Sequence, residues 1–167
     1  IYNKELIATP PESMEQLIKF AHRFKAMRPD HYPFLYDINS FFFSFALISG
    51  PGGYIFKDRG GTLDTSDIGL ANSGAVRGAT LIQELINSKI VPSSTDRNIA
   101  FAKMKGGVLA MTIDGPWSVN DLQKSGINFG VAPIPTIGGE VARPLVGTHG
   151  FIIRRSAPDQ ELISILL

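Results

Sequence analysis

MKGGVLAMTIDGPWSV, residues 104–119, is the stretch from which the fold of this chain can be inferred. Residues 108–113 form a short apolar run between a Gly-Gly pair and a Gly-Pro pair, which predicts a buried strand. Pro116 suits the first position of a helix, and Asp114 lies where its carboxylate can accept hydrogen bonds from the free N–H groups of the helix start. A strand that turns directly into a helix places Trp117, the one tryptophan in the chain, at the carboxyl end of a sheet, where open α/β sheets bind ligands.

The composition narrows the class of protein. A chain of 167 residues with 44% hydrophobic residues is long enough for one domain with a sizeable core. The net charge is only +1 and the Lys and Arg residues are scattered, which argues against a nucleic-acid groove. Cys is absent, which excludes disulfides and thiolate nucleophiles. No apolar run is long enough to cross a bilayer and the start does not resemble a signal peptide; because the first residue is Ile, we expect that the natural start was removed.

Hydrophobic periodicity predicts helices that alternate with strands, as in α/β domains. The expected helices cover residues 13–27, 39–49, 72–88, 95–105, 116–124 and 159–167, and the first begins with a Ser-x-x-Gln capping box. The expected strands cover residues 33–38, 54–57, 108–113, 128–132, 142–147 and 151–153. Gly126 is expected to end one helix, and Gly138 with Gly139 to form a hairpin turn. The third helix is expected to bury Val76, Ala79, Ile82, Leu85 and Ile86.

Four phenylalanines crowd the start of the second expected helix, at positions 41, 42, 43 and 45. They cannot all face one side of a helix with 3.6 residues per turn. One interpretation is a helix buried on both sides. The other is that one or two rings form an apolar platform on which the C–H face of a sugar stacks. Periodicity alone leaves both interpretations open.

Several segments together resemble one family. Residues 107–117 match the pattern Gly-x-x-Ala-Met-x-Ile-x-Gly-Pro-Trp, and similar matches occur at residues 10–16, 52–56, 67–75 and 129–147. These motifs are similar to those of the maltose/maltodextrin-binding proteins, the extracytoplasmic solute-binding components of sugar ABC transporters. That family more often has Asn where this chain has Asp114.

The resemblance also implies a binding site. Counting back from Gly52 places Ser40, Phe41 and Phe42 where the family carries a Glu-Pro-Tyr trio that grips the sugar. Phe42 keeps the ring without the hydroxyl, and Ser40 lacks the carboxylate, so affinity and selectivity are expected to differ. We therefore expect Trp117 as the main stacking ring, Phe42 as the second ring and Phe41 as a contact. Ser40 and Asn39 are the expected hydrogen-bond partners, and no metal or cofactor is expected.

The fold that the resemblance implies is an α/β, periplasmic-binding-protein-like lobe of type II, with a central sheet flanked by helices. Residues 1–147 would form most of the second lobe of a two-lobed protein, and residues 148–167 a crossing segment with a partial helix of the first lobe. Family members are more than twice as long, so we interpret this chain as a truncated domain that carries about half of the site. Its exposed cleft face would be an apolar patch that a dimer or a segment swap can cover.

The implied function is binding of maltose or maltodextrin for delivery to an ABC transporter permease, in the periplasm or outside the cell, on a membrane-anchored lipoprotein in a Gram-positive source. The alternatives are a binding protein for another sugar and, less favoured, a glycoside-processing enzyme with Asp37 and Asp114 as its two acids. Capping or turn roles explain both aspartates without catalysis. His22, His31 and His149 lack metal-ligand spacing, and no nucleotide-binding motif occurs.

Overall fold

The strand predicted from residues 108–113 lies at the centre of the fold. In the computed structural model, which describes residues 1–158 and 165, all residues of β5 (Leu109–Thr112) are buried. The sheet has the strand order β2-β5-β1-β6. β2 (Tyr32–Leu35) runs parallel to β5, while β1 (Tyr2–Asn3) runs antiparallel to both β5 and β6 (Phe129–Gly130). The fold is therefore α/β with a mixed sheet flanked by helices.

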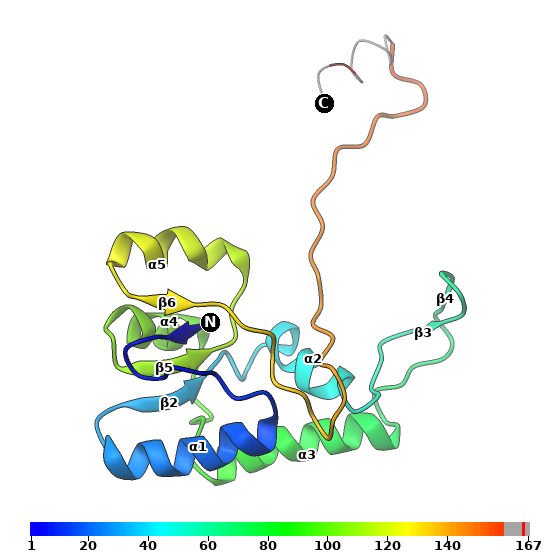
Figure 1. Cartoon of the computed structure of the whole chain (residues 1–167). Helices are drawn as coiled ribbons and strands as arrows, with labels where there is room; N and C mark the ends of the chain where they lie inside the picture. Colours follow the sequence, from blue (N-terminus) through cyan, green and yellow to red (C-terminus); the bar gives the residue numbers. More distant parts are fainter. Residues whose placement is uncertain (159–164, 166–167) are drawn as a thin grey trace.

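The helices begin within three residues of the starts that the sequence predicted. The long helices are α1 (Met14–Met27) and α3 (Ser73–Asn87), and the shorter ones are α2 (Phe41–Ser49), α4 (Arg97–Lys105) and α5 (Val119–Ser125). Ser13, Asn72 and Asp96 cap α1, α3 and α4, each with a side-chain oxygen that accepts from the N–H three residues later. Figure 1 shows α1 and α3 on the β2 side of the sheet and α5 beyond β6.

The core lies between the sheet and its helices. α1 contributes Met14, Leu17, Ala21 and Phe24, which are all buried. At the carboxyl end of β2, Tyr36 is fully buried, and this burial raises the pKa of its hydroxyl to about 12. The phenol therefore stays neutral at physiological pH and acts as a large apolar filler.

The prediction for the buried face of α3 was wrong in part. Leu85 is buried as expected, but Val76 and Ala79 are exposed, and the buried residues in the first half of the helix are Gly74, Ala75 and Gly78. A Cβ atom at Gly78 would lie within 3.0 Å of backbone atoms of Leu47 and Ile48. The backbones of α2 and α3 approach closely here, which requires small residues. Small residues therefore occupy the buried face of α3 at this point, where the periodicity predicted larger apolar side chains.

A short hairpin replaces most of the strand predicted at residues 54–57. β3 (Lys57–Asp58) pairs with β4 (Leu63–Asp64), and Tyr54 makes only an isolated bridge to Gly69. Gly60 and Gly61 have φ values of +73° and +92°, which let the chain reverse, and the Asp58 carboxylate accepts from the Gly61 N–H at 2.7 Å. The chain therefore turns at residues 58–61, and the strand starts later than the sequence predicted.

The expected strands at residues 142–147 and 151–153 do not form. The predicted hairpin turn is present, with φ values of +59° at Gly138 and +82° at Gly139, but it closes only the bridge between Ile137 and Glu140. Residues 148–158 then run away from the body of the molecule (Figure 1), and the side chains of Phe151 and Ile152 are 86% and 95% exposed. A strand needs a neighbour for its N–H and C=O groups, and no described segment pairs with this one. The helix expected at residues 159–167 lies outside the described residues, apart from residue 165.

The Asp96 cap gives a testable stability prediction. Its Oδ1 accepts from the Ile99 N–H at 2.8 Å, at the start of the helix that leads into β5. We expect Asp96→Ala to lower the free energy of unfolding by about 1 kcal/mol, because a free N–H of the first turn loses its partner. Urea unfolding followed by circular dichroism measures this change. Ser94→Ala, at an exposed loop position nearby, is the control, and an equal loss in both variants would contradict a capping role.

Candidate functional site

The turn that follows β5 carries the tryptophan. A 3-10 turn, η1 (Pro116–Ser118), precedes α5, so the helix predicted from Pro116 begins with a tighter first turn. Pro116 holds the first position as expected, and Gly126, at φ +76°, ends α5 as expected. The side chain of Trp117 is 53% exposed at the carboxyl end of the sheet. A large apolar ring that is half exposed at this edge is available to a ligand.

The expected capping role of Asp114 was wrong. The residue that caps η1 is Gly115, and no side chain caps this turn. Asp114 instead accepts from the Gly115 N–H at 2.8 Å and forms an ion pair with Arg97 of α4. The sequence did not reveal this pairing because the two residues lie on different elements.

Three aromatic rings meet beside the turn. The ring centroid of Trp117 lies 6.1 Å from that of Phe42 and 6.4 Å from that of Phe43. Phe42 and Phe43, which are neighbours at the start of α2, meet edge to face at 5.4 Å. These tilted and edge-on contacts are the favourable geometries for aromatic pairs, so the rings support one another. Phe43 is almost wholly buried, and Phe42 lies between it and the surface.

The aromatic cluster borders a hollow of about 290 Å³, which we call the Trp117 hollow. Its walls come from α2, from the β5–η1 turn and from two later segments; the lining residues are Phe42, Phe43, Ile113, Asp114, Gly115, Pro116, Trp117, Ile134, Pro144, Leu145, Val146 and Gly147. The volume is close to the lower end of the range for small-molecule sites, roughly 300 Å³. The walls are mainly apolar, with backbone groups between the rings, which suits a flat ligand that has apolar faces and polar edges.

The other expected site residues lie elsewhere. The Phe41 ring is 47% exposed, packs on Phe45 at 5.5 Å and does not line the Trp117 hollow. The Asn39 amide donates to the carbonyl oxygens of Ser93 and Thr95, both at 3.2 Å, and so ties the start of α2 to a neighbouring loop. Ser40 precedes α2 and makes no side-chain cap hydrogen bond. Of the five expected residues, the structure therefore brings together Trp117 and Phe42.

Sequence reasoning did not assign Phe43 or residues 144–147 to the site. Phe43 had a signal, because it belongs to the run of phenylalanines, but helical phase did not show which rings of the run turn toward Trp117. Residues 144–147 had none, because they reach the hollow through an irregular segment whose path depends on tertiary contacts. One of these contacts is the Ser49 hydroxyl, which donates to the Arg143 carbonyl at 2.7 Å.

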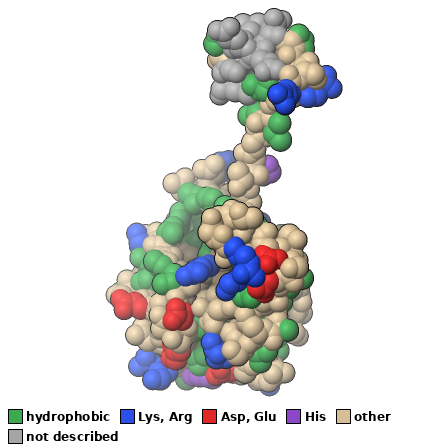
Figure 2. Space-filling model, turned by 90° about the vertical axis from the view of Figure 1, so that its right-hand side faces the viewer, with side chains coloured by type: hydrophobic (Ala, Val, Ile, Leu, Met, Phe, Trp, Pro, Cys, Tyr) green, Lys and Arg blue, Asp and Glu red, His purple; other side chains and the backbone are tan. Residues whose placement is uncertain are grey.

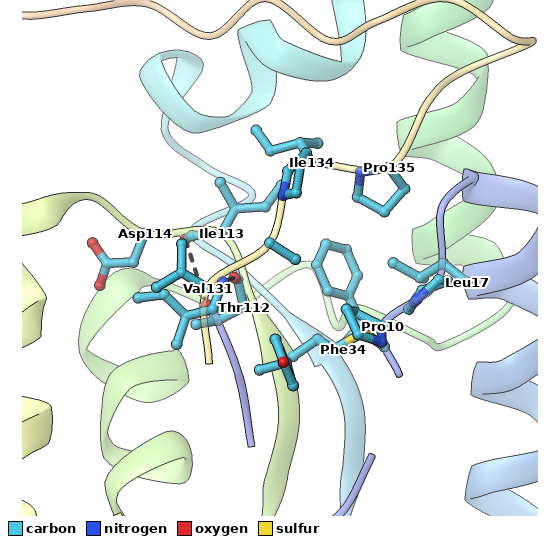
Figure 3. A pocket seen from close by; sticks show the side chains of 15 residues that line it. Pro10, Leu17, Phe34, Thr112, Ile113, Asp114, Val131, Ile134 and Pro135 are labelled. Carbon is cyan, nitrogen blue, oxygen red and sulfur yellow. Dashed lines mark hydrogen bonds between the residues drawn. The ribbon is translucent and has the colours of Figure 1, made fainter. Parts of the chain in front are cut away.

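A smaller hollow lies at the end of the sheet. It has a volume of about 110 Å³ and lies among the ends of β2 and β5, α1 and residues 131–135 (Figure 3). Its walls include Phe34, Leu17, Pro10 and Pro135, and Figure 3 shows the Asp114 carboxylate pointing away from it. This small apolar space offers little to a polar ligand, and we interpret it as imperfect packing between the sheet and residues 131–135.

A larger hollow of about 540 Å³ lies between the end of α2 and the β3–β4 hairpin. Its hydroxyl groups are engaged within the protein: Tyr54 donates to Asp67 at 2.7 Å, and Ser49 donates to Arg143 as described above. On the face that carries the hairpin, basic and acidic side chains lie side by side next to hydrophobic ones (Figure 2). Arg59 accounts for part of this pairing, with ion pairs to Asp64 and Asp67. Because its hydroxyl groups already have partners, this hollow is a weaker candidate.

Of the two acidic residues considered for catalysis, Asp114 has a side-chain partner, because its carboxylate is paired with Arg97. The main-chain carbonyl of Asp37 accepts from the Ser40 N–H at 3.3 Å in the turn before α2. Among residues 1–158 and 165, no group of His, Asp and Glu is placed to hold a metal ion. Within the same residues, no helix is both long and apolar enough to cross a membrane.

Comparison with known proteins identifies the chain's relatives. A family model described as bacterial extracellular solute-binding protein matches residues 1–163. A galactooligosaccharide-binding protein of Bacillus subtilis is 30% identical over 96% of this chain and 40% of its own length. A maltodextrin-binding protein of the same organism is 31% identical over the same shares. A maltooligosaccharide ABC transporter solute-binding lipoprotein of Streptococcus pneumoniae is 30% identical over 96% of this chain and 39% of its own length. The chain thus spans about two fifths of these relatives.

Proposed function

Because this chain belongs to the family of bacterial extracellular solute-binding proteins, we propose that it carries part of a binding site for maltodextrin-type oligosaccharides and catalyses no reaction. The observation that carries the proposal is the aromatic cluster of Trp117, Phe42 and Phe43 at the edge of the Trp117 hollow. Sugar rings present C–H faces that stack on aromatic rings, while their hydroxyls need polar partners. Trp117 is the main stacking ring in this proposal and Phe42 the second.

The polar side of the site is less complete. Ser40 is the proposed hydrogen-bond donor on this chain, since its hydroxyl makes no capping bond to α2. Asn39 is the second proposed partner and Phe41 a peripheral contact; neither lines the Trp117 hollow. We propose that further polar groups come from a first lobe that this chain does not include.

The greater length of the relatives supports the proposed domain organisation. We propose that residues 1–147 form most of the second lobe of a two-lobed protein, and that residues 148–167 cross to the first lobe. The path of residues 148–158 away from the body supports this proposal (Figure 1). In the intact protein, sugar would shift an equilibrium between open and closed arrangements of the lobes, and the closed form would deliver it to an ABC transporter permease. We propose a location outside the cytoplasmic membrane, as a periplasmic protein or an anchored lipoprotein.

A second candidate ligand is a galactooligosaccharide. The relative named for that sugar and the relative named for maltodextrin are almost equally similar to this chain, at 30% and 31% identity. Aromatic stacking alone does not distinguish the two, because both sugars have apolar C–H patches on their rings. The orientation of the hydroxyls decides between them, so the ligand has to be measured.

Titration of the single tryptophan tests the proposal. The fluorescence of Trp117 is recorded with maltose, maltotriose, a cyclodextrin and a galactotriose, and with spermidine as a control. We expect a saturable change with a maltodextrin even at a Kd of about 1 mM, which corresponds to about −4 kcal/mol. A response to galactotriose alone would favour the second candidate. A response to spermidine alone, or no response to any sugar well above the millimolar range, would contradict the proposed function.

A further inference from the structure

The side chain of Asp114 is a buried carboxylate, and the guanidinium of Arg97 contacts both of its oxygens. Only 3% of its side chain is exposed, at the end of the buried strand β5. Arg97, at the start of α4, donates from Nε to Oδ1 at 3.2 Å, and its Nη2 lies 3.2 Å from Oδ2. A planar guanidinium that meets both carboxylate oxygens fixes the orientation of the carboxylate as well as its charge. The two residues are 17 positions apart, so the pair joins α4 to the end of β5.

The fixed carboxylate in turn holds the backbone that carries Trp117. Asp114 Oδ1 accepts from the Gly115 N–H at 2.8 Å, and the Gly115 carbonyl accepts from the Ser118 hydroxyl at 2.7 Å. The indole of Trp117 lies directly against Gly115, where a Cβ atom would collide with its six-membered ring. A rotation of the Gly115 peptide would therefore displace the indole. The contacts form a continuous path from Arg97 through Asp114 and Gly115 to Trp117.

We propose that Arg97 and Asp114 are positioning residues, which hold the β5–η1 turn so that the Trp117 ring stays against Phe42 and Phe43. Direct binding of a sugar by the Asp114 carboxylate fits the structure less well, because Oδ1 already accepts hydrogen bonds from Arg97 and Gly115, and Oδ2 forms an ion pair with Arg97. Figure 3 shows how the carboxylate points away from the sheet-end hollow. The consequence for ligand affinity rests on the proposed function, whereas the effect on Trp117 itself does not.

The test uses the tryptophan as its own reporter, in the absence of sugar. The variants are Arg97→Gln, Asp114→Asn and the double variant. Arg97→Gln leaves a buried carboxylate without its partner, so we expect the turn to rearrange, with a shifted emission maximum and about two-fold stronger acrylamide quenching of Trp117. The double variant removes both charges and keeps an amide oxygen for the Gly115 N–H, so its emission and quenching should return close to those of the parent chain. The same pattern is expected in maltotriose affinity, with about a five-fold loss in Arg97→Gln and recovery in the double variant.

Arg59→Gln is the matched control. Arg59 also pairs with carboxylates, those of Asp64 and Asp67, but on the β3–β4 hairpin. Its removal should leave the emission and quenching of Trp117 unchanged. If Arg97→Gln does not fold, the double variant and Asp114→Asn still report on the turn. Both carry Asn at position 114, so neither leaves a buried carboxylate without a partner.

Two results would overturn the proposal. One is a folded Arg97→Gln variant whose Trp117 emission and quenching match the parent chain. The other is a double variant whose Trp117 emission and quenching differ from the parent chain as much as those of Arg97→Gln. That result would mean that the effect comes from lost packing and does not depend on the charge pair. If the parent chain binds no sugar, the proposed function fails while the spectra still decide whether the pair positions Trp117.

Discussion

The Trp117→Ala variant is expected to bind maltotriose at least ten-fold more weakly than the parent chain, a loss of about 1.4 kcal/mol or more. Trp117 is the largest exposed ring at the Trp117 hollow, and truncation removes the stacking surface and leaves Phe42 without its neighbour. Aromatic side chains at the centre of a binding site carry a large share of the affinity. Because the variant has no tryptophan, isothermal titration calorimetry has to measure the binding.

The comparison with two phenylalanine variants makes this result specific. Phe42→Ala should weaken binding by a smaller factor, about three- to five-fold, since Phe42 contributes less exposed surface to the hollow. Phe56→Ala is the control, because Phe56 is an exposed aromatic residue that lines the larger hollow beside the hairpin. Equal losses in Trp117→Ala and Phe56→Ala, or none in Trp117→Ala, would place the sugar elsewhere.

Local signals were sufficient for several helix ends. The Ser13 side chain caps α1 as the sequence predicted, because a cap depends on residues within one turn of the helix start. For α3 and α4 the sequence offered two adjacent candidates each, Asn72 or Ser73 and Thr95 or Asp96, and the structure has Asn72 and Asp96 as the caps. The central strand and the reversal at Gly126 were predictable for the same reason. These features are encoded by neighbours in the sequence, so a reading of the sequence alone recovers them.

Features that depend on tertiary partners were not predictable. Residues 151–153 have the composition of a strand, but strand formation also requires an adjacent strand, and none of the described residues provides one. The mixed direction of the sheet is another example, since β1 enters antiparallel between β5 and β6 although it is only two residues long. Nothing in a segment of that length indicates its partner.

The same distinction between local signals and tertiary contacts applies to the candidate site. The strand-turn-helix pattern predicted the position of Trp117 without any knowledge of the rest of the fold. The choice among the phenylalanines of α2 depends on how that helix is rotated against the sheet, which turns Phe42 and Phe43 toward Trp117 and Phe41 toward Phe45. The ion pair of Arg97 with Asp114 likewise needs the structure, because a charged pair between two elements leaves no periodic pattern in the sequence.

α2 packs closely against α3 at Gly78, and this contact gives the second prediction. Gly78→Val is expected to lower the free energy of unfolding by about 3 kcal/mol and the melting temperature by roughly 10 °C. A side chain at position 78 would meet backbone atoms of Leu47 and Ile48, which cannot move aside as a flexible side chain can. The helices would have to separate, and Trp117 fluorescence should change as well, because α2 carries Phe42 and Phe43. Thermal and urea unfolding by circular dichroism measure the stability.

Ala79→Val is the matched control, since it adds a similar side chain one position later in the same helix. Position 79 is exposed, so this variant should change the stability by less than about 1 kcal/mol. The sequence pattern alone predicts the opposite order, because it places Ala79 on the buried face and gives Gly78 no role. If Ala79→Val lowers the free energy of unfolding more than Gly78→Val does, the buried face of α3 would be the one that the periodicity predicts. That result would contradict the close approach of the two helices. The expected order would instead show that a glycine contact between α2 and α3 holds the aromatic side of the Trp117 hollow in place.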